Sequence, residues 1–275
     1  MTKEEIKKEK KLLKLEKKNE KLNKKNEAEE LKLNKYNEDA PKRIKKEKIK
    51  KIHQEMNEAP KRSVLEEVGN SVSHGVGAIL AIVALIVMLY HLNPDKVYNY
   101  NLAVLATIIY TVCMFMTMIN SSLYHSWKSG STVKRVWRRF DYSAIYLLIA
   151  GTFAPLFLIF LIQYNEVLAI TLIIIQWVFV IFGITMNGVF GPGRIKVLNY
   201  FLYFAIGWSG IVFIPFFIKY NQPLLWYILI GGLTYTLGMI PFAFKKFKAT
   251  HFVFHLIIVI SAIIQWAGIF ICLYL

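Results

Sequence analysis

Two histidines, His251 and His255, stand four residues apart in "HFVFHLIIVI", where an apolar run begins. Residues four apart share one face of a helix, so both imidazoles can bind the same ion. A third histidine, His125, closes "SSLYH" near the end of another apolar run. Imidazole ligands with few carboxylates nearby favour zinc over calcium or magnesium, although iron, nickel and copper also accept them. The sequence therefore predicts a zinc site with three protein ligands and a fourth position open, as in a catalytic zinc.

A catalytic zinc also needs a group that moves protons. The segment "HFVFH" has no carboxylate between its histidines, so the general base must come from another helix. Asp141 is the only acidic residue that we expect at the boundary of a membrane span between residues 68 and 275. We therefore predict that Asp141 acts as general base and acid. Ser121, one helical turn before His125, is predicted to hydrogen bond a developing oxyanion or the reacting water.

These residues lie at the ends of apolar runs that are long enough to cross a membrane. Runs of about 20 apolar residues are typical of membrane-spanning helices. The sequence predicts an all-α membrane protein, a seven-transmembrane helix bundle over residues 63–275. The expected spans are about 74–92, 100–123, 141–162, 166–187, 198–218, 223–243 and 251–273.

The segment before the bundle, residues 1–62, is low in complexity and rich in lysine. It holds 22 of the 34 Lys and Arg residues and 13 of the 18 Asp and Glu residues. We predict a basic cytoplasmic tail that can form a helix and that is solvated or lies on anionic lipid. Nucleic acid is not an expected partner, because Tyr36 is the only aromatic residue of the tail apart from His53 and no binding motif is present.

Charge in the loops predicts the orientation of the bundle. With the tail in the cytoplasm, ten basic residues fall in cytoplasmic loops and two, Lys96 and Lys219, in the opposite loops. Positive loops face the cytoplasm, so we expect the N-terminus inside and the C-terminus outside. The metal site then lies near the cytoplasmic side. The ten are Lys128, Lys134, Arg135, Arg138, Arg139, Arg194, Lys196, Lys245, Lys246 and Lys248.

A further motif precedes the first expected span. "EEVGNSVSH" places Glu67, Asn70 and His74 on one helical face. In one interpretation these residues contact the zinc ligands without binding the metal, and so orient them, or they line the cytoplasmic mouth of the site. In the other, Asn70 caps the first span and Glu67 pairs with a basic loop residue such as Arg138 or Arg139. The sequence leaves both open.

Together, "EEVGNSVSH", "SSLYH", "RRFDYSAIYLLIAGTFAPL" and "HFVFH" resemble the haemolysin III branch of the progestin and adipoQ receptor family. That family is part of a wider superfamily of seven-span membrane hydrolases that includes alkaline ceramidases. The resemblance covers the chain beyond the tail. It implies seven helices, an intracellular N-terminus and a zinc held by His125, His251 and His255, with Ser121 and Asp141 beside the reacting water.

The leading functional hypothesis is a zinc-dependent hydrolase in the plasma membrane that cleaves an amide or ester bond of a membrane lipid. One alternative is a receptor-like or signalling protein in which zinc is structural and the basic tail is the output device. A third, a lytic protein, follows only from the name of the family, and the spans lack the rings of charge that line a pore. The sequence indicates neither the bond cleaved nor the oligomeric state.

Overall fold

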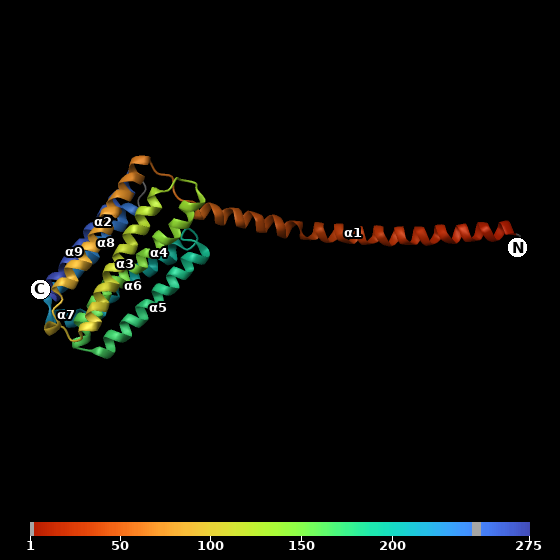
Figure 1. Cartoon of the computed structure of the whole chain (residues 1–275). Coiled ribbons are helices and arrows are strands. Elements are labelled where there is room, and N and C mark those ends of the chain that lie inside the picture. Colours follow the sequence, from red (N-terminus) through yellow and green to blue (C-terminus); the bar gives the residue numbers. More distant parts are fainter. Residues whose placement is uncertain (1–2, 244–248) are drawn as a thin grey trace. The chain divides into compact units, whose positions relative to one another are not determined.

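The computed structural model describes residues 3–243 and 249–275, and this part of the chain is helical throughout, without a strand. The chain divides into two compact units, Met1–Met56 and Asn57–Leu275. The first consists of one long helix, α1 (Lys3–Asn57), drawn in red and orange in Figure 1. Lysine and glutamate are good helix formers, which explains why so polar a segment is helical.

The second unit contains the predicted transmembrane bundle. Within the described residues, seven helical segments are long and apolar enough to cross a membrane, which confirms the predicted fold class. Two of these spans are composite, because short 3-10 or π turns interrupt their α-helices. The spans are α2 (Val64–His91); α3 (Tyr100–Ser126); α4 (Thr132–Pro155) with η2 (Leu156–Phe160) and η3 (Leu161–Gln163); α5 (Glu166–Phe190); α6 (Lys196–Gly207) with η4 (Trp208–Phe213) and α7 (Ile214–Tyr220); α8 (Gln222–Ala243); and α9 (Thr250–Leu273).

Two spans begin earlier than the apolar runs predicted. The first begins at Val64 rather than at residue 74, and the third at Thr132 rather than at residue 141. In each case a serine side chain caps the helix: Ser63 accepts a hydrogen bond from the backbone of Glu66, and Ser131 one from the backbone of Lys134. Such caps start a helix before its apolar part.

The early start of α4 corrects the assignment of four basic residues. The sequence placed Lys134, Arg135, Arg138 and Arg139 in a loop, but all four lie within the first half of α4. Lys134 and Arg138 are buried within the bundle, so these residues of α4 are not simply loop charges. Three further lysines assigned to a loop, Lys245, Lys246 and Lys248, lie outside the described residues.

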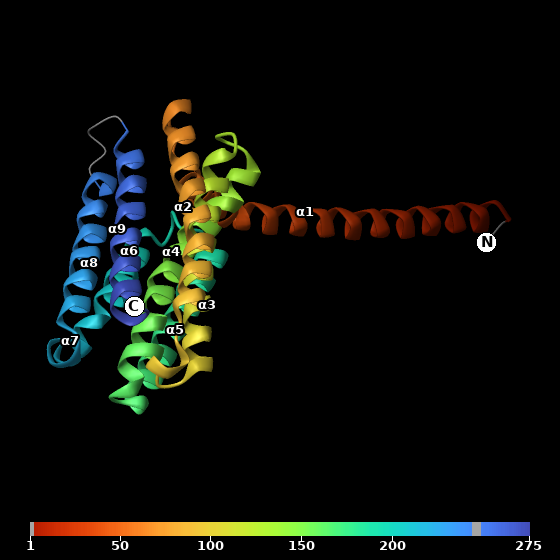
Figure 2. The same cartoon turned by 60° about the vertical axis from the view of Figure 1, so that its left-hand side comes forward.

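Helices α2 and α3 pack side by side, as both views of the bundle show (Figures 1 and 2). The buried face of α2 carries Ala78, Ala81 and Ala84. Small residues let helix backbones approach closely in a membrane, where the hydrophobic effect does not drive helix association. Nearer the start of α2, the hydroxyl of Ser71 lies 2.8 Å from the hydroxyl of Ser126 on α3. The contact fixes the register between the beginning of α2 and the end of α3.

On the other side of α4, a buried polar chain joins three helices. The Tyr146 hydroxyl on α4 donates to Asn199 Oδ1 on α6 over 2.8 Å, and Asn199 Nδ2 donates to Asn187 Oδ1 on α5 over 2.8 Å. The Tyr146 ring lies directly against Gly183 of α5, where a Cβ atom would approach Tyr146 Cζ to 2.3 Å. The glycine is therefore needed for the close approach of α4 and α5.

We expect Gly183→Ala to lower the free energy of unfolding by about 1–3 kcal/mol, because the new methyl group must displace the Tyr146 ring. The measurement is the thermal unfolding of purified protein in detergent. Gly188→Ala on the same helix is the control, since nothing lies within 4 Å of its added Cβ. An unchanged midpoint for Gly183→Ala would contradict the packing of α4 against α5.

Candidate metal centre

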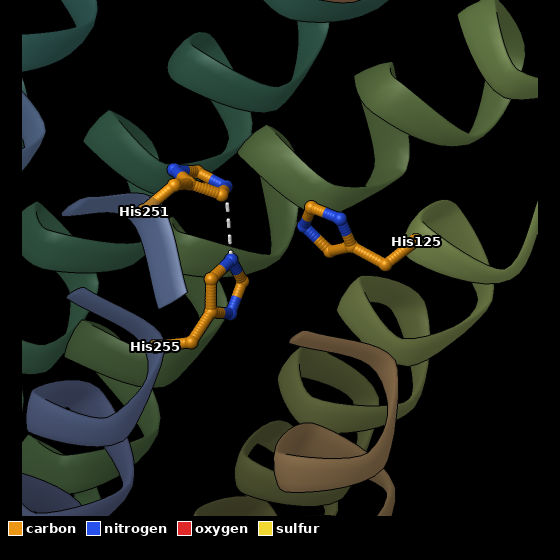
Figure 3. A group of neighbouring side chains, drawn as sticks. All are labelled: His125, His251 and His255. Carbon is orange, nitrogen blue, oxygen red and sulfur yellow. Dashed lines mark hydrogen bonds between the residues drawn. The ribbon is translucent and has the colours of Figure 1, made fainter. Parts of the chain in front are cut away.

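Three histidines from two helices converge at one end of the bundle (Figure 3). His125 lies in the last turn of α3, and His251 and His255 lie in the first two turns of α9. Each offers a ring nitrogen, and the three nitrogens lie within 4.8 Å of one another. The Nε2 atoms of His251 and His255 are 3.0 Å apart. The three side chains could therefore hold one metal ion.

Hydrogen bonding determines which nitrogen of His125 is available to a metal. Its Nδ1 lies 2.5 Å from Glu67 Oε2. A carboxylate only accepts hydrogen bonds, so Nδ1 carries the hydrogen and donates it. This leaves a lone pair on Nε2, which is buried and has no hydrogen-bond partner among the described residues. A carboxylate behind a ligating histidine is the usual way to fix its tautomer and its ring orientation.

The ring of His255 is held in a similar way. Its Nδ1 lies 2.8 Å from Nε2 of His74, a residue of α2 that is 3% exposed. When His255 Nδ1 donates this hydrogen bond, His255 Nε2 presents its lone pair to the nitrogen of His251. The two orienting contacts, Glu67 to His125 and His74 to His255, both come from α2. They leave the Nε2 atoms of His125 and His255 directed at the same small volume.

A buried lysine holds Glu67 in place. Lys134 is fully buried, and its ammonium group lies 2.8 Å from Glu67 Oε1 and donates to the carbonyl of Trp127 over 3.0 Å. The group also lies over the ring of Tyr124, 5.0 Å from its centroid. The cation beside one oxygen and the imidazole N–H at the other offset the cost of removing the Glu67 carboxylate from water.

The sequence analysis missed the role of Lys134 because it placed the residue in a loop. Lys134, Arg138 and Asp141 are spaced four and three residues apart and so share one face of α4, a signal that a longer helix would have revealed. The structure also contradicts one of the two interpretations of Glu67. Its cationic partner is Lys134, so the predicted pairing with Arg138 or Arg139 is wrong. The predicted cap at Asn70 is also wrong.

Asn70 lies inside α2 and is fully buried, and its amide nitrogen is 3.3 Å from His125 Nδ1. The structure thus brings the three residues of the first motif against the histidine cluster. Ser121 and Asp141 lie at the same end of the bundle and line a cavity together with His74, His251 and His255. Ser121 is 2% exposed, and its hydroxyl has no hydrogen-bond partner among the described residues.

The fold and this cluster define an integral, multi-pass membrane protein whose helix bundle has a buried group of three histidines that could hold a metal ion. Residues 62–266 match the model of a protein family described as haemolysin-III related. The chain is 36% identical over 196 residues to Hemolysin-3 of Bacillus cereus, covering 71% of this chain and 86% of the relative. It is 30% identical over 195 residues to the Hemolysin-3 homolog of Bacillus subtilis (strain 168), covering 70% of this chain and 87% of the relative.

The chain therefore belongs to the haemolysin III family, and the resemblance stated from its motifs is confirmed. The family match spans the whole histidine cluster, from Glu67 on α2 to His255 on α9, while all of α1 lies outside it.

We expect Glu67→Gln to weaken metal binding by about 10–100-fold, because an uncharged amide orients His125 less firmly than a carboxylate does. The measurement is a titration of metal-free protein with Co²⁺, followed by the visible absorption of the bound ion. Glu66→Gln is the matched control, since the Glu66 carboxylate makes no hydrogen bond or ion pair among the described residues. Equal affinities in the two variants would contradict an orienting role for Glu67.

Proposed function

We propose that this protein is a zinc-dependent hydrolase that cleaves an amide or ester bond of a membrane lipid. The observation that carries the proposal is the buried Nε2 atom of His125, which has no hydrogen-bond partner among the described residues and faces the nitrogens of His251 and His255. A lone pair in a buried site without a hydrogen donor is stabilised by a cation. Three imidazoles fit zinc, which prefers nitrogen and sulfur ligands.

The cavity beside the histidines supports a lipid as substrate. At the metal end its lining includes Ser121, Asp141, His74, His251 and His255. The rest is mostly apolar and comes mainly from α4, α8, α9 and the span that contains α6 and α7. A polar end and a long apolar remainder match the chemistry of a lipid head and its acyl chain. The apolar part includes Ile145, Leu148, Phe153, Leu156, Ile211, Ile214, Leu225, Ile228 and Leu229.

The proposed reaction is a hydrolysis. A zinc ion held by the three histidines would polarise the substrate carbonyl and acidify water. Asp141 accepts a proton from the attacking water as its oxygen joins the acyl carbon, and returns the proton to the departing nitrogen or oxygen. The Ser121 hydroxyl donates a hydrogen bond to the carbonyl oxygen as negative charge develops there. The carbon–nitrogen or carbon–oxygen bond breaks, giving a carboxylic acid and an amine or alcohol.

The names of these relatives associate them with haemolysis, which raises the alternative of a lytic protein. The described lining of the cavity contains a single acidic residue, Asp141, and neither lysine nor arginine. A water-filled path for ions is normally lined by several charged or carbonyl groups along its length. The cavity therefore supports a lipid site better than it supports a pore.

For the orientation, we propose that the metal end faces the cytoplasm in the plasma membrane. In the part of the chain that the structure describes, Lys128, Arg135, Arg139, Arg194 and other basic residues lie at the ends of helices on the histidine side. Among the described basic residues of the bundle, only Lys96 and Lys219 lie at the opposite ends. The lysines of α1 would then attract the anionic lipids of the cytoplasmic leaflet.

Asp141→Asn tests the catalytic proposal. We expect this variant to keep about one zinc per chain and to lose about 10²–10⁴-fold in turnover, because the amide cannot accept the proton. The measurements are metal analysis and hydrolysis of N-acyl amines and acyl esters in mixed micelles. Asp95→Asn, at the opposite end of the bundle, is the matched control and keeps full activity.

The double variant His251→Ala, His255→Ala completes this test, since it should lose both zinc and turnover. Wild-type protein without zinc would refute the proposal. Unchanged hydrolysis in Asp141→Asn would refute the role of Asp141. A zinc-loaded wild type that hydrolyses neither class of lipid would instead favour the signalling alternative, in which the metal is structural.

The orientation predicts which loops a membrane-impermeant maleimide reaches. In a chain whose two native cysteines, Cys113 and Cys272, are replaced by alanine, Asp95→Cys should react in sealed right-side-out vesicles. Lys128→Cys should react only after the vesicles are opened. Both native positions are exposed on the described surface, so accessibility within the protein is matched. The reverse labelling pattern would overturn the proposed orientation.

A further inference from the structure

The apolar part of the cavity contains a second pair of polar side chains, Tyr235 of α8 and Gln265 of α9. The Tyr235 hydroxyl is buried and has no hydrogen-bond partner among the described residues. Gln265 is 8% exposed, and its amide takes part in no hydrogen bond within the same residues. Two polar groups that lack partners thus line a cavity inside a membrane domain.

The two side chains lie at similar depth. A Cβ atom on Gly231 would come within 2.4 Å of Gln265 Cγ, so Gln265 packs against α8 at the level of Gly231. Tyr235 follows Gly231 by one helical turn. Long side chains of a helix lean toward its N-terminus, which directs the ring of Tyr235 back toward the level of Gly231. The hydroxyl and the amide therefore converge on one region of the cavity.

Two threonines of the same lining, in contrast, are satisfied within the protein. The hydroxyl of Thr152 donates to the carbonyl of Leu148 over 2.8 Å, and that of Thr117 donates to the carbonyl of Cys113 over 2.8 Å. Threonine can bond to its own helix, whereas the long side chains of tyrosine and glutamine reach beyond it. An unpaired polar group in an apolar setting is costly, so Tyr235 and Gln265 need a partner in the cavity itself.

The spacing along α9 measures how far this pair lies from the metal end. Gln265 follows His255 by ten residues, which corresponds to about 15 Å along a helix axis. With carbon–carbon bonds of about 1.5 Å in an extended zigzag, about ten to twelve carbons of an acyl chain cover that length. An acyl carbonyl placed at the histidines would therefore bring a carbon near position 12 to the pair.

We propose that the lipid substrate has an acyl chain with a hydrogen-bonding group, a hydroxyl or an oxo group, about ten to twelve carbons from the cleaved bond. Tyr235 donates to the oxygen of that group, and the Gln265 amide donates to it or accepts from a hydroxyl. The inference rests on the proposed function for the position of the cleaved bond. The rest of the chain contacts the apolar lining.

The test compares the binding of 12-hydroxyoctadecanoic acid and octadecanoic acid to the purified, zinc-loaded full chain in detergent. Trp208, which lines the cavity, provides a fluorescence signal. We expect the 12-hydroxy acid to bind about tenfold more tightly, since two unpaired groups gain a partner. 2-Hydroxyoctadecanoic acid, with its hydroxyl near the carboxylate, should show no such gain from this pair.

Variants of Tyr235 and Gln265 test whether these two side chains cause the preference for the 12-hydroxy acid. Tyr235→Phe and Gln265→Met should each reduce the preference for the 12-hydroxy acid and leave the binding of octadecanoic acid nearly unchanged. Tyr227→Phe, a tyrosine of α8 that is not part of the cavity lining, is the matched control and should keep the preference. Equal binding of the two acids by the wild type, or binding of neither, would overturn the proposal. So would an undiminished preference in both cavity variants.

The same experiment separates this proposal from the proposed function. A preference for the 12-hydroxy acid in a protein that hydrolyses no lipid would support the second polar site and refute the hydrolase. Hydrolysis of N-acyl amines by a protein that shows no preference for the 12-hydroxy acid would support the hydrolase and refute the second polar site. A protein with both properties should cleave the 12-hydroxyoctadecanoyl amide with a lower KM than the octadecanoyl amide.

Discussion

The largely buried carboxylate of Glu67, whose side chain is 12% exposed, is the constraint on which the histidine cluster depends. Removing a charge from water is expensive unless it is paired, and Glu67 is paired with Lys134 at one oxygen and accepts the N–H of His125 at the other. Since Lys134 supplies the compensating charge, His125 can stay neutral. The contact joins α2, α3 and α4 at one end of the bundle and directs the Nε2 atom of His125 toward α9.

From this contact, the positions of the other side chains follow through the helices. The register of α2 that places Glu67 against Nδ1 of His125 also places His74, two turns later, against Nδ1 of His255. One helix thus orients ligands on two others. Packing of α2 against α3 through small residues and the contact of Ser71 with Ser126 keep that register. The geometry of the cluster is therefore set by helix packing rather than by flexible loops.

The sequence predicted what depends on local pattern. Apolar runs predicted seven spans, and the spacing of His251 and His255 predicted a shared helical face. Span boundaries were wrong at Val64 and Thr132 because hydropathy marks the edge of the apolar part, whereas a serine cap decides where the helix starts. The partners of Glu67 could not be predicted, since Lys134 and Arg138 lie on the same face of α4 and only the tertiary packing distinguishes them.

The membrane surroundings also determine what a cavity of this kind can select. An acyl chain gains almost nothing from the hydrophobic effect when it moves from the bilayer into an apolar cavity, because both surroundings are equally dry. Apolar lining therefore admits any lipid chain that fits, and selectivity must come from polar contacts. The described cavity offers such contacts at the histidine end and at Tyr235 and Gln265. A lipid with polar groups at both places gives hydrogen-bond partners to the histidine end and to the second pair, and so removes the free-energy cost of both unpaired polar sites. An ordinary saturated chain can remove only the first.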